Sequence, residues 1–172
     1  LHGETMDHPD AITFVHREAI GVCVAITPWN IPLFSAILKL APALAAGNTV
    51  VLKPAESVCL SVLEFVKEIA DVLPPGVLNV VTGLGGALGE ALVSDPRVRK
   101  VSFTGSRPTA RKIMGYASTH IIPQTMELGG KSANIVCEDA DIEAAAEGAV
   151  LSTIFNKGEV CIAGTRVLVH EK

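Results

Sequence analysis

Aromatic side chains and clustered basic charge are both scarce in this chain. Of its 172 residues, 4% are Phe, Trp or Tyr, and its 14 Lys and Arg residues are dispersed under a net charge of −4. Binding to nucleic acid needs Lys and Arg gathered on one face, so we expect no nucleic-acid partner. Long apolar runs are missing too, because Lys39 and Pro42 interrupt the longest one before it reaches the ~20 residues that span a membrane. We therefore expect a soluble chain with no membrane partner.

Closely spaced cysteines are also absent. Cys23, Cys59, Cys137 and Cys161 form no CxxC pair and have no histidine close by in a ligand spacing. The spacing therefore predicts neither a metal site nor a disulfide framework. Unpaired cysteines are typical of a reducing compartment, and we expect a cytoplasmic location.

The first residues lack the features of a targeting segment. Residues 1–10, LHGETMDHPD, are polar and do not begin with Met, which leads us to expect an internal piece of a longer protein. The mean hydropathy of +0.43 is high for a soluble chain. We accordingly expect some apolar surface that sequence outside this piece would cover.

What the chain does have is a regular alternation of two periodicities. β-branched runs predict strands, and apolar residues at helical spacing predict helices between them. This alternation is typical of a parallel sheet with crossover helices, and hence of the α/β class. The expected strands cover residues 20–27, 48–54, 77–82, 100–104, 125–128, 134–136 and 165–171. The expected helices cover residues 32–46, 57–73, a short stretch within 83–96, 105–118 and 142–155.

Polar and glycine residues follow most of the predicted strands. In an open parallel sheet, ligands bind outside the carboxyl ends of the strands, so we expect these residues to gather at one site. They are Pro28, Trp29 and Asn30 after the first strand, Lys53 and Glu56 after the second, Gly83 after the third, Gly105 and Ser106 after the fourth, and Glu127 at the end of another.

Each of these motifs also has a plainer interpretation. The glycines of TGLGGALG (82–89) follow a strand and open a helix, as phosphate cradles do, or they form an ordinary loop. FTGS (103–106) offers an anion the N–H groups of a helix start, or it is a tight turn. Lys53 either meets a ligand or a carboxylate, or it extends its amine to solvent. Glu56 either accepts hydrogen bonds from a ribose or is an exposed acid at a helix start.

Glu127 and Cys161 are the candidates for chemistry. Glu127 lies between Met126 and Leu128 and before two glycines; apolar surroundings would suit it to general-base work, and a surface charge is the plainer interpretation. Cys161 lies among small residues beyond a helix, where a thiolate can attack a carbonyl, although most single cysteines are buried and inert. We assign that inert role to Cys23, Cys59 and Cys137.

Together these segments resemble the aldehyde dehydrogenase superfamily over about residues 21–169. Five motifs match in order: TPWNIP, GNTVVLKPAE, FTGS, MELGGKS and FNKGEVC. The resemblance implies a doubly wound, mostly parallel Rossmann-like sheet with flanking helices, followed by the beginning of the catalytic domain. Residues 1–130 would be part of the dinucleotide-binding domain, and residues 131–172 would be the start of the nucleophile-bearing catalytic domain.

The resemblance also implies a role for each site residue. Cys161 would attack the aldehyde, Asn30 and the Cys161 main-chain N–H would form the oxyanion hole, and Glu127 would activate the water that hydrolyses the thioester. NAD would accept the hydride, with Lys53 and Glu56 on its adenosine ribose and Glu56 making NADP the less favoured cofactor. No metal is implied. The remaining cofactor-binding residues would be Thr27, Pro28, Trp29, Gly83, Gly105, Ser106, Leu128 and Gly129.

The resemblance has departures. Ile31 stands where the family commonly has an aromatic residue and Ala110 where it has glycine, while Glu159 and Val160 precede the cysteine where many members have Gln and Cys. It further implies that the motif for the nicotinamide ribose, most of the catalytic domain and the oligomerisation strands lie outside this sequence. The whole protein would be a homodimer or homotetramer acting on an aldehyde that the sequence does not specify.

Three alternatives stay open. A CoA-acylating aldehyde dehydrogenase would use a thiol in place of water, and Glu127 argues against it because no water then needs a base. A truncated, non-catalytic nucleotide-binding piece would keep the fold without turnover, and we expect the isolated 172 residues to be inactive. A cysteine hydrolase would need a histidine base near Cys161, for which the sequence offers His16, His120 and His170.

Overall fold

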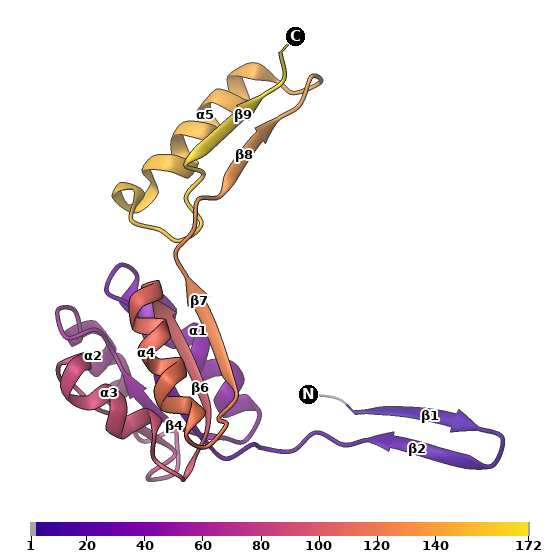
Figure 1. Ribbon diagram of the computed structural model, residues 1–172, viewed down its shortest axis with the longest axis vertical. Coiled ribbons are helices and arrows are strands. Elements are labelled where there is room, and N and C mark those ends of the chain that lie inside the picture. The colour runs from indigo at the N-terminus through magenta and orange to yellow at the C-terminus, as the bar shows by residue number, and fades with distance from the viewer. Residues whose placement is uncertain (1–2, 172) are drawn as a thin grey trace.

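Five parallel strands form the main sheet of the protein, whose computed structural model describes residues 3–171. The strands are β3 (Val22–Ile26), β4 (Thr49–Lys53), β5 (Leu78–Val80), β6 (Val98–Gly105) and β7 (Gln124–Leu128). The helices α1 (Pro32–Ala45), α2 (Leu60–Glu68), α3 (Gly85–Val93) and α4 (Arg107–Ser118) alternate with them along the chain (Figure 1). The predicted α/β class, with a mostly parallel sheet and flanking helices, is confirmed. Helix α2 is shorter than the expected 57–73, because the chain turns over residues 69–72 before Pro74.

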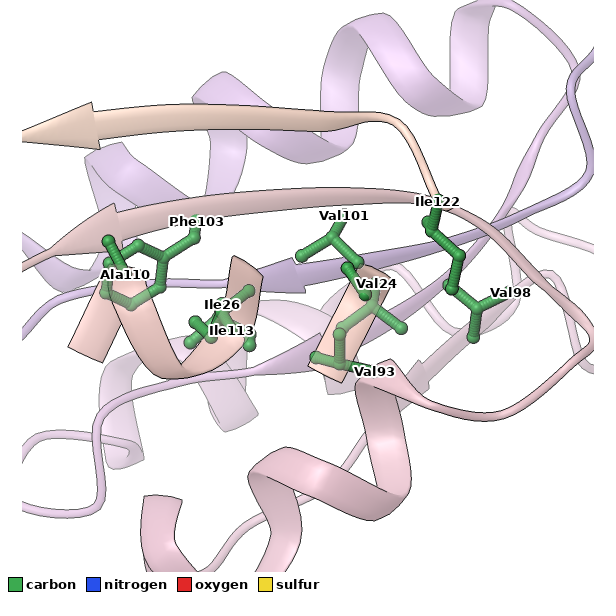
Figure 2. Close-up of a cluster of buried hydrophobic side chains, with 10 residues drawn as sticks. Val24, Ile26, Val93, Val98, Val101, Phe103, Ala110, Ile113 and Ile122 are labelled. Carbon is green, nitrogen blue, oxygen red and sulfur yellow. The ribbon is translucent and has the colours of Figure 1, made fainter. Parts of the chain in front are cut away.

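Alternate residues of the central strand β3 face opposite layers, as the two-residue period of a strand requires. Cys23 and Ala25 pack against buried side chains of α1 and α2. Val24 and Ile26 belong to a second buried cluster, to which α3 and α4 contribute (Figure 2). Burying a Val or Leu side chain stabilises a fold by about 1.5–3 kcal/mol, so these two clusters stabilise the packing of helices on both faces of the sheet. The sheet is therefore doubly wound.

The strand order places a switch point in the middle of the sheet. The strands follow the order β5-β4-β3-β6-β7, so the chain starts at β3, moves outward through β4 to β5, and then returns to the other side of β3. Strands β3 and β6 are neighbours, with Ile26 of β3 opposite Phe103 of β6. Successive crossovers leave in opposite directions from this pair, which is where open α/β sheets bind their ligands.

A second, smaller unit follows the main sheet. Strands β8 (Ala133–Val136) and β9 (Arg166–Val169) pair in parallel, and helix α5 (Ile142–Ile154) with the short 3-10 segment η1 (Phe155–Gly158) connects them. The Asp141 carboxylate caps α5 by accepting a hydrogen bond from the Ala144 main-chain N–H at 3.1 Å. Figure 1 shows this unit beyond the end of β7.

Apolar side chains are exposed on this smaller unit. No residue of α5 is fully buried, and Val150, Leu151 and Ile154 all lie open on its surface. The high mean hydropathy of the chain therefore appears in part as exposed apolar surface. Within residues 3–171, none of the helices is long and apolar enough to cross a membrane.

An antiparallel hairpin that we did not predict begins the described chain. Strands β1 (Glu4–His8) and β2 (Ala11–Val15) pair with His8 opposite Ala11, which leaves Pro9 and Asp10 as a two-residue turn. The hairpin extends away from the main sheet (Figure 1), and Phe14 on it is 71% exposed. We expected this segment only to be a polar start, although a Pro-Asp turn signal precedes the β-forming run AITFV.

Candidate active site

A cleft of about 1420 Å³ extends along the α1 face of the main sheet to the carboxyl ends of its strands. It continues to the segment that carries Cys161, so it joins the main sheet to the smaller unit. The predicted site residues that line it are Thr27, Pro28, Trp29, Asn30, Lys53, Glu56, Gly105, Ser106, Glu127, Leu128, Gly129 and Cys161. Residues from five separated parts of the sequence are thus brought together.

Gly83 is the exception, because it lies outside the lining of this cleft. Its φ of +150° is a conformation that other residues rarely adopt, and a Cβ there would lie 2.7 Å from Leu88 Cδ1. Gly83 therefore makes the turn, and the later glycines Gly85 and Gly86 at the start of α3 face the cleft. A Cβ on either of those two glycines would meet no described atom within 4 Å.

Lys53 and Glu56 form an ion pair at the end of β4. The Lys53 Nζ donates to Glu56 Oε2 at 3.3 Å and to the Pro54 carbonyl oxygen at 3.2 Å. The Lys53 side chain is 4% exposed, whereas that of Glu56 is 50% exposed. A hydrogen bond from its own main-chain N–H, and then the bond and charge of Lys53, lower the pKa of the Glu56 carboxyl. An ionised acceptor therefore stands beside a cleft-lining ammonium group.

The residue just beyond β3, Thr27, is buried and has an unpartnered side-chain hydroxyl among the described residues. Its main-chain N–H donates to the Lys53 carbonyl oxygen at 3.1 Å, which extends the pairing of β3 with β4. Its hydroxyl oxygen makes no hydrogen bond with any described residue, although Thr27 is 3% exposed. Buried polar atoms are normally paired, so this hydroxyl is available to a ligand in the cleft. Trp29, two residues later, presents an exposed ring to the same cleft.

Gly105 and Ser106 join β6 to α4. A Cβ on Gly105 would lie 2.6 Å from Cζ of the buried Phe103 ring, so no larger residue fits without displacing the core. The Ser106 hydroxyl caps α4 by accepting a bond from the Thr109 main-chain N–H at 3.4 Å. Ala110, the one departure from the family pattern noted above that lies in α4, is buried in the core and does not line the cleft.

Asn30 contacts the segment that carries Cys161. The Asn30 Nδ2 donates to the Glu159 carbonyl oxygen at 2.6 Å, and the Asn156 Nδ2 donates to the Asn30 carbonyl oxygen at 3.1 Å. Cys161 itself is exposed and follows η1 in a turn. Two hydrogen bonds therefore hold the candidate nucleophile's segment beside the candidate oxyanion donor.

Glu127 is the penultimate residue of β7 and opposes Thr104 of β6. The sequence left two interpretations of this carboxylate open, apolar surroundings and a surface charge. Among the described residues Glu127 is exposed to the cleft, because the side chains of a strand alternate between faces. No histidine lines the cleft within the described chain, so His16, His120 and His170 are not placed to act as a base for Cys161.

Known proteins provide an independent comparison. A model of the aldehyde dehydrogenase family matches residues 1–172. The chain belongs to the aldehyde dehydrogenase family. It is 51% identical to the acetaldehyde dehydrogenase of Pseudomonas aeruginosa, over 98% of this chain and 35% of that protein.

Two solved structures of similar proteins share the fold of this aldehyde dehydrogenase family member. The NAD+ complex of an aldehyde dehydrogenase from Bacillus cereus has a TM-score of 0.93 and 43% identity, over 99% of this chain and 35% of that chain. An E. coli enzyme described as NADP dependent has a TM-score of 0.92 and 43% identity, over 99% of this chain and 36% of that chain. The present chain thus spans about a third of the length of its relatives.

Lys39 is a cleft residue that sequence reasoning missed in this family member. It lies on α1, is 9% exposed, and donates from Nζ to the Ser102 hydroxyl at 2.9 Å. Burial lowers the pKa of its ammonium group, and the negative charge of Glu127 acts in the opposite direction. The signal was present in the sequence, because Lys39 interrupts an apolar helix, but we used it only to exclude a membrane span.

The other cysteines only partly match the inert role assigned to them. Cys23 is buried in β3, and burial raises the pKa of its thiol against a smaller opposing effect of Lys100. Cys59 is half-buried. Cys137 is exposed, so the prediction that it packs in the core is wrong within the described chain: it lies just beyond the last residue of β8, outside the small sheet.

Proposed function

We propose that the protein to which this chain belongs oxidises an aldehyde to a carboxylic acid, with NAD as the hydride acceptor and Cys161 as the nucleophile. The observation that carries the proposal is the single cleft that Cys161, Asn30 and Glu127 line together with Lys53 and Glu56. A nucleophile, an oxyanion donor, a base and a ribose-binding pair are the parts this reaction needs.

In the proposed reaction, the Cys161 thiolate attacks the aldehyde carbon, a C–S bond forms, and the carbonyl electron pair moves to oxygen. The Asn30 amide and the Cys161 main-chain N–H stabilise that oxyanion; loss of one such donor typically costs about 3–4 kcal/mol of barrier. When bound, NAD supplies the acceptor for the hydride that leaves this carbon, so that a thioester remains on Cys161. Glu127 then takes a proton from water, whose oxygen attacks the thioester carbon while the C–S pair returns to sulfur.

The cleft residues fit a dinucleotide. The unpaired Thr27 hydroxyl and the ionised Glu56 carboxylate offer hydrogen bonds, and Gly85 and Gly86 leave open space at the start of α3. A helix N-terminus with exposed N–H groups favours a pyrophosphate. Glu56 supports NAD over NADP, because a 2′-phosphate at the ribose would face a carboxylate. Lys53, which is paired with Glu56, would also bind the ribose.

We further propose the organisation and setting of the whole protein. The boundary between the dinucleotide-binding domain (1–130) and the start of the catalytic domain (131–172) falls between β7 of the main sheet and β8 of the smaller one. The substrate is a small aldehyde, which the name of the Pseudomonas aeruginosa relative supports. We propose a homodimer or homotetramer, as the resemblance implies, and a cytoplasmic location, as the unpaired cysteines favour.

The experiment that tests the reaction is the substitution Glu127→Gln in the full-length protein. Stopped-flow mixing with NAD and acetaldehyde should give a normal burst of NADH, and the steady rate should fall by about 10²–10⁴-fold because the thioester is no longer hydrolysed. The matched control is Glu90→Gln, an exposed acid on α3 outside the cleft, which should leave both phases unchanged. An unchanged steady rate in Glu127→Gln would overturn the assignment, and turnover that requires CoA would favour the acylating alternative.

A further inference from the structure

Two asparagine side chains and two main-chain carbonyls join the nucleophile loop, defined as residues 155–164, to the loop after β3. Asn30 donates from its side chain to the Glu159 carbonyl oxygen at 2.6 Å, and Asn156 donates from its side chain to the Asn30 carbonyl oxygen at 3.1 Å. The Glu159 main-chain N–H donates to the Asn156 carbonyl oxygen at 3.0 Å, which closes the ring. The three residues thus form one connected set of bonds across more than 120 residues of sequence.

The backbone of the nucleophile loop is unusual where these bonds form. Asn156, Lys157 and Gly158 have φ of 49°, 62° and 76° in succession. Asparagine and glycine adopt this left-handed conformation far more readily than most residues do. Asparagine at position 156 therefore meets two requirements at once, since it tolerates the backbone and its amide supplies the N–H that Asn30 accepts.

The bond to Glu159 also determines which way the Asn30 amide faces. A carbonyl oxygen can only accept a hydrogen bond, so the NH2 group of Asn30, and not its oxygen, must face the nucleophile loop. One N–H of that group is used by Glu159. The nitrogen carries a second N–H, and Cys161 follows Glu159 by two residues along the nucleophile loop.

The other end of the nucleophile loop is anchored separately. The Gly164 main-chain N–H donates to the Ser152 carbonyl oxygen at 3.2 Å, and the Thr153 hydroxyl donates to the Gly164 carbonyl oxygen at 3.2 Å. Cys161 therefore lies between an anchor on α5 and the contact with Asn30. Loss of the Asn156 bond would release one end only.

We propose that Asn156 is a positioning residue that sets the oxyanion donor Asn30 against Cys161. This inference rests on the proposed function, because Asn156 would affect the reaction only through the oxyanion hole that the proposed function requires. Asn156 holds the main chain of Asn30, Glu159 holds its amide, and the second amide N–H is left for the oxygen of the substrate. Asn156 touches neither substrate nor sulfur in this scheme.

The test compares Asn156→Asp with Lys157→Asn in the full-length protein. Aspartate matches asparagine in shape and tolerates the left-handed backbone, but its carboxylate cannot donate to the Asn30 carbonyl. Lys157 shares the backbone conformation and does not line the cleft, so Lys157→Asn is the matched control. We expect Asn156→Asp to slow the NADH burst roughly tenfold. This is less than the loss of about 100-fold that a misplacement of about 1 Å can cause, because the Glu159 bond still holds the Asn30 amide. NAD affinity and the rate of Cys161 alkylation by iodoacetamide should stay within about twofold, since neither needs an oxyanion hole.

A double substitution separates positioning from general support of the fold. Asn30→Ala alone should slow the burst about 100-fold, and adding Asn156→Asp to it should cost little more, because the group being positioned is already gone. An equal loss from Asn156→Asp in both backgrounds, no loss at all, or the same loss in Lys157→Asn would overturn the proposal.

Hydrogen exchange decides the contact without any need for turnover. In Asn156→Asp, peptides covering residues 27–34 and 155–164 should both exchange faster than in the parent protein and in Lys157→Asn. Unchanged exchange in either peptide would refute the contact in solution. A parent protein that gives no NADH burst would instead overturn the proposed function, and the exchange result would still decide whether Asn156 joins the two loops.

Discussion

Replacing Gly105 with alanine adds one methyl group at the point where β6 enters the cleft. The new Cβ would lie 2.6 Å from Cζ and 3.1 Å from Cε2 of Phe103, whose side chain is buried with Ala110 and Ile113. Carbon atoms pack at about 3.5–4.0 Å, so the ring or the strand end must move by roughly 1 Å. Overpacking a core in this way costs about 1–3 kcal/mol. Gly105 does not have a positive φ in the left-handed range, so the cost comes from packing and not from the backbone.

Gly115 in the middle of α4 provides the matched control. A Cβ there meets no described atom within 4 Å, so Gly115→Ala should stabilise the helix by about 0.5–1 kcal/mol. The two variants should therefore shift the thermal unfolding midpoint of the full-length protein in opposite directions. Phe103→Leu, which removes the clashing ring atoms, should make Gly105→Ala less harmful when the two are combined. Equal midpoints for Gly105→Ala and the parent protein would refute this account of the site.

Two further predictions concern charge in the cleft. Glu56→Gln in the full-length protein should raise the ratio of kcat/KM with NADP to kcat/KM with NAD by about tenfold. The change is modest because solvent screens half-exposed charges. An unchanged ratio would show that Glu56 does not determine cofactor choice. Burial lowers the pKa of the Lys39 ammonium group below its ordinary value of 10.5. Between the lowered pKa and 10.5, Lys39 therefore binds a proton in the unfolded chain but not in the folded one. The free energy of unfolding of the parent protein rises with pH over this range. The unfolding midpoint of the parent relative to Lys39→Met should therefore increase from pH 7 toward pH 10, and a constant difference would contradict the buried charge.

The order and class of the elements in the main sheet were predictable because their signals are local. Strands β3 to β6 lie in β-branched runs, and the helices between the strands carry apolar residues at helical spacing. Doubly wound packing follows, since helices must cover both faces of a parallel sheet. Element ends were less predictable, as α2 illustrates, because turns at the end of a helix depend on what the chain packs against next.

The hairpin and Lys39 show where local signals did not suffice. Hairpin β1–β2 makes little contact with the main sheet, so its strands lack the buried apolar face by which we recognised the others. Lys39 was visible as a charge in an apolar helix, but its proximity to Glu127 depends on how α1 packs across the sheet. Both are matters of tertiary arrangement.

By itself, the sequence determined that Gly105, Asn30, Glu127 and Cys161 each lie at or just after the end of a regular element, and that five motifs occur in the family's order. It could not show that Gly83 serves the turn while Gly86 faces the cleft, since that depends on the path of the chain beyond the strand. Nor could it show that Asn156 bonds to Asn30. Hydrophobic periodicity extends over a few residues, whereas a bond between residues 126 apart exists only once two separate units have packed and brought their loops together.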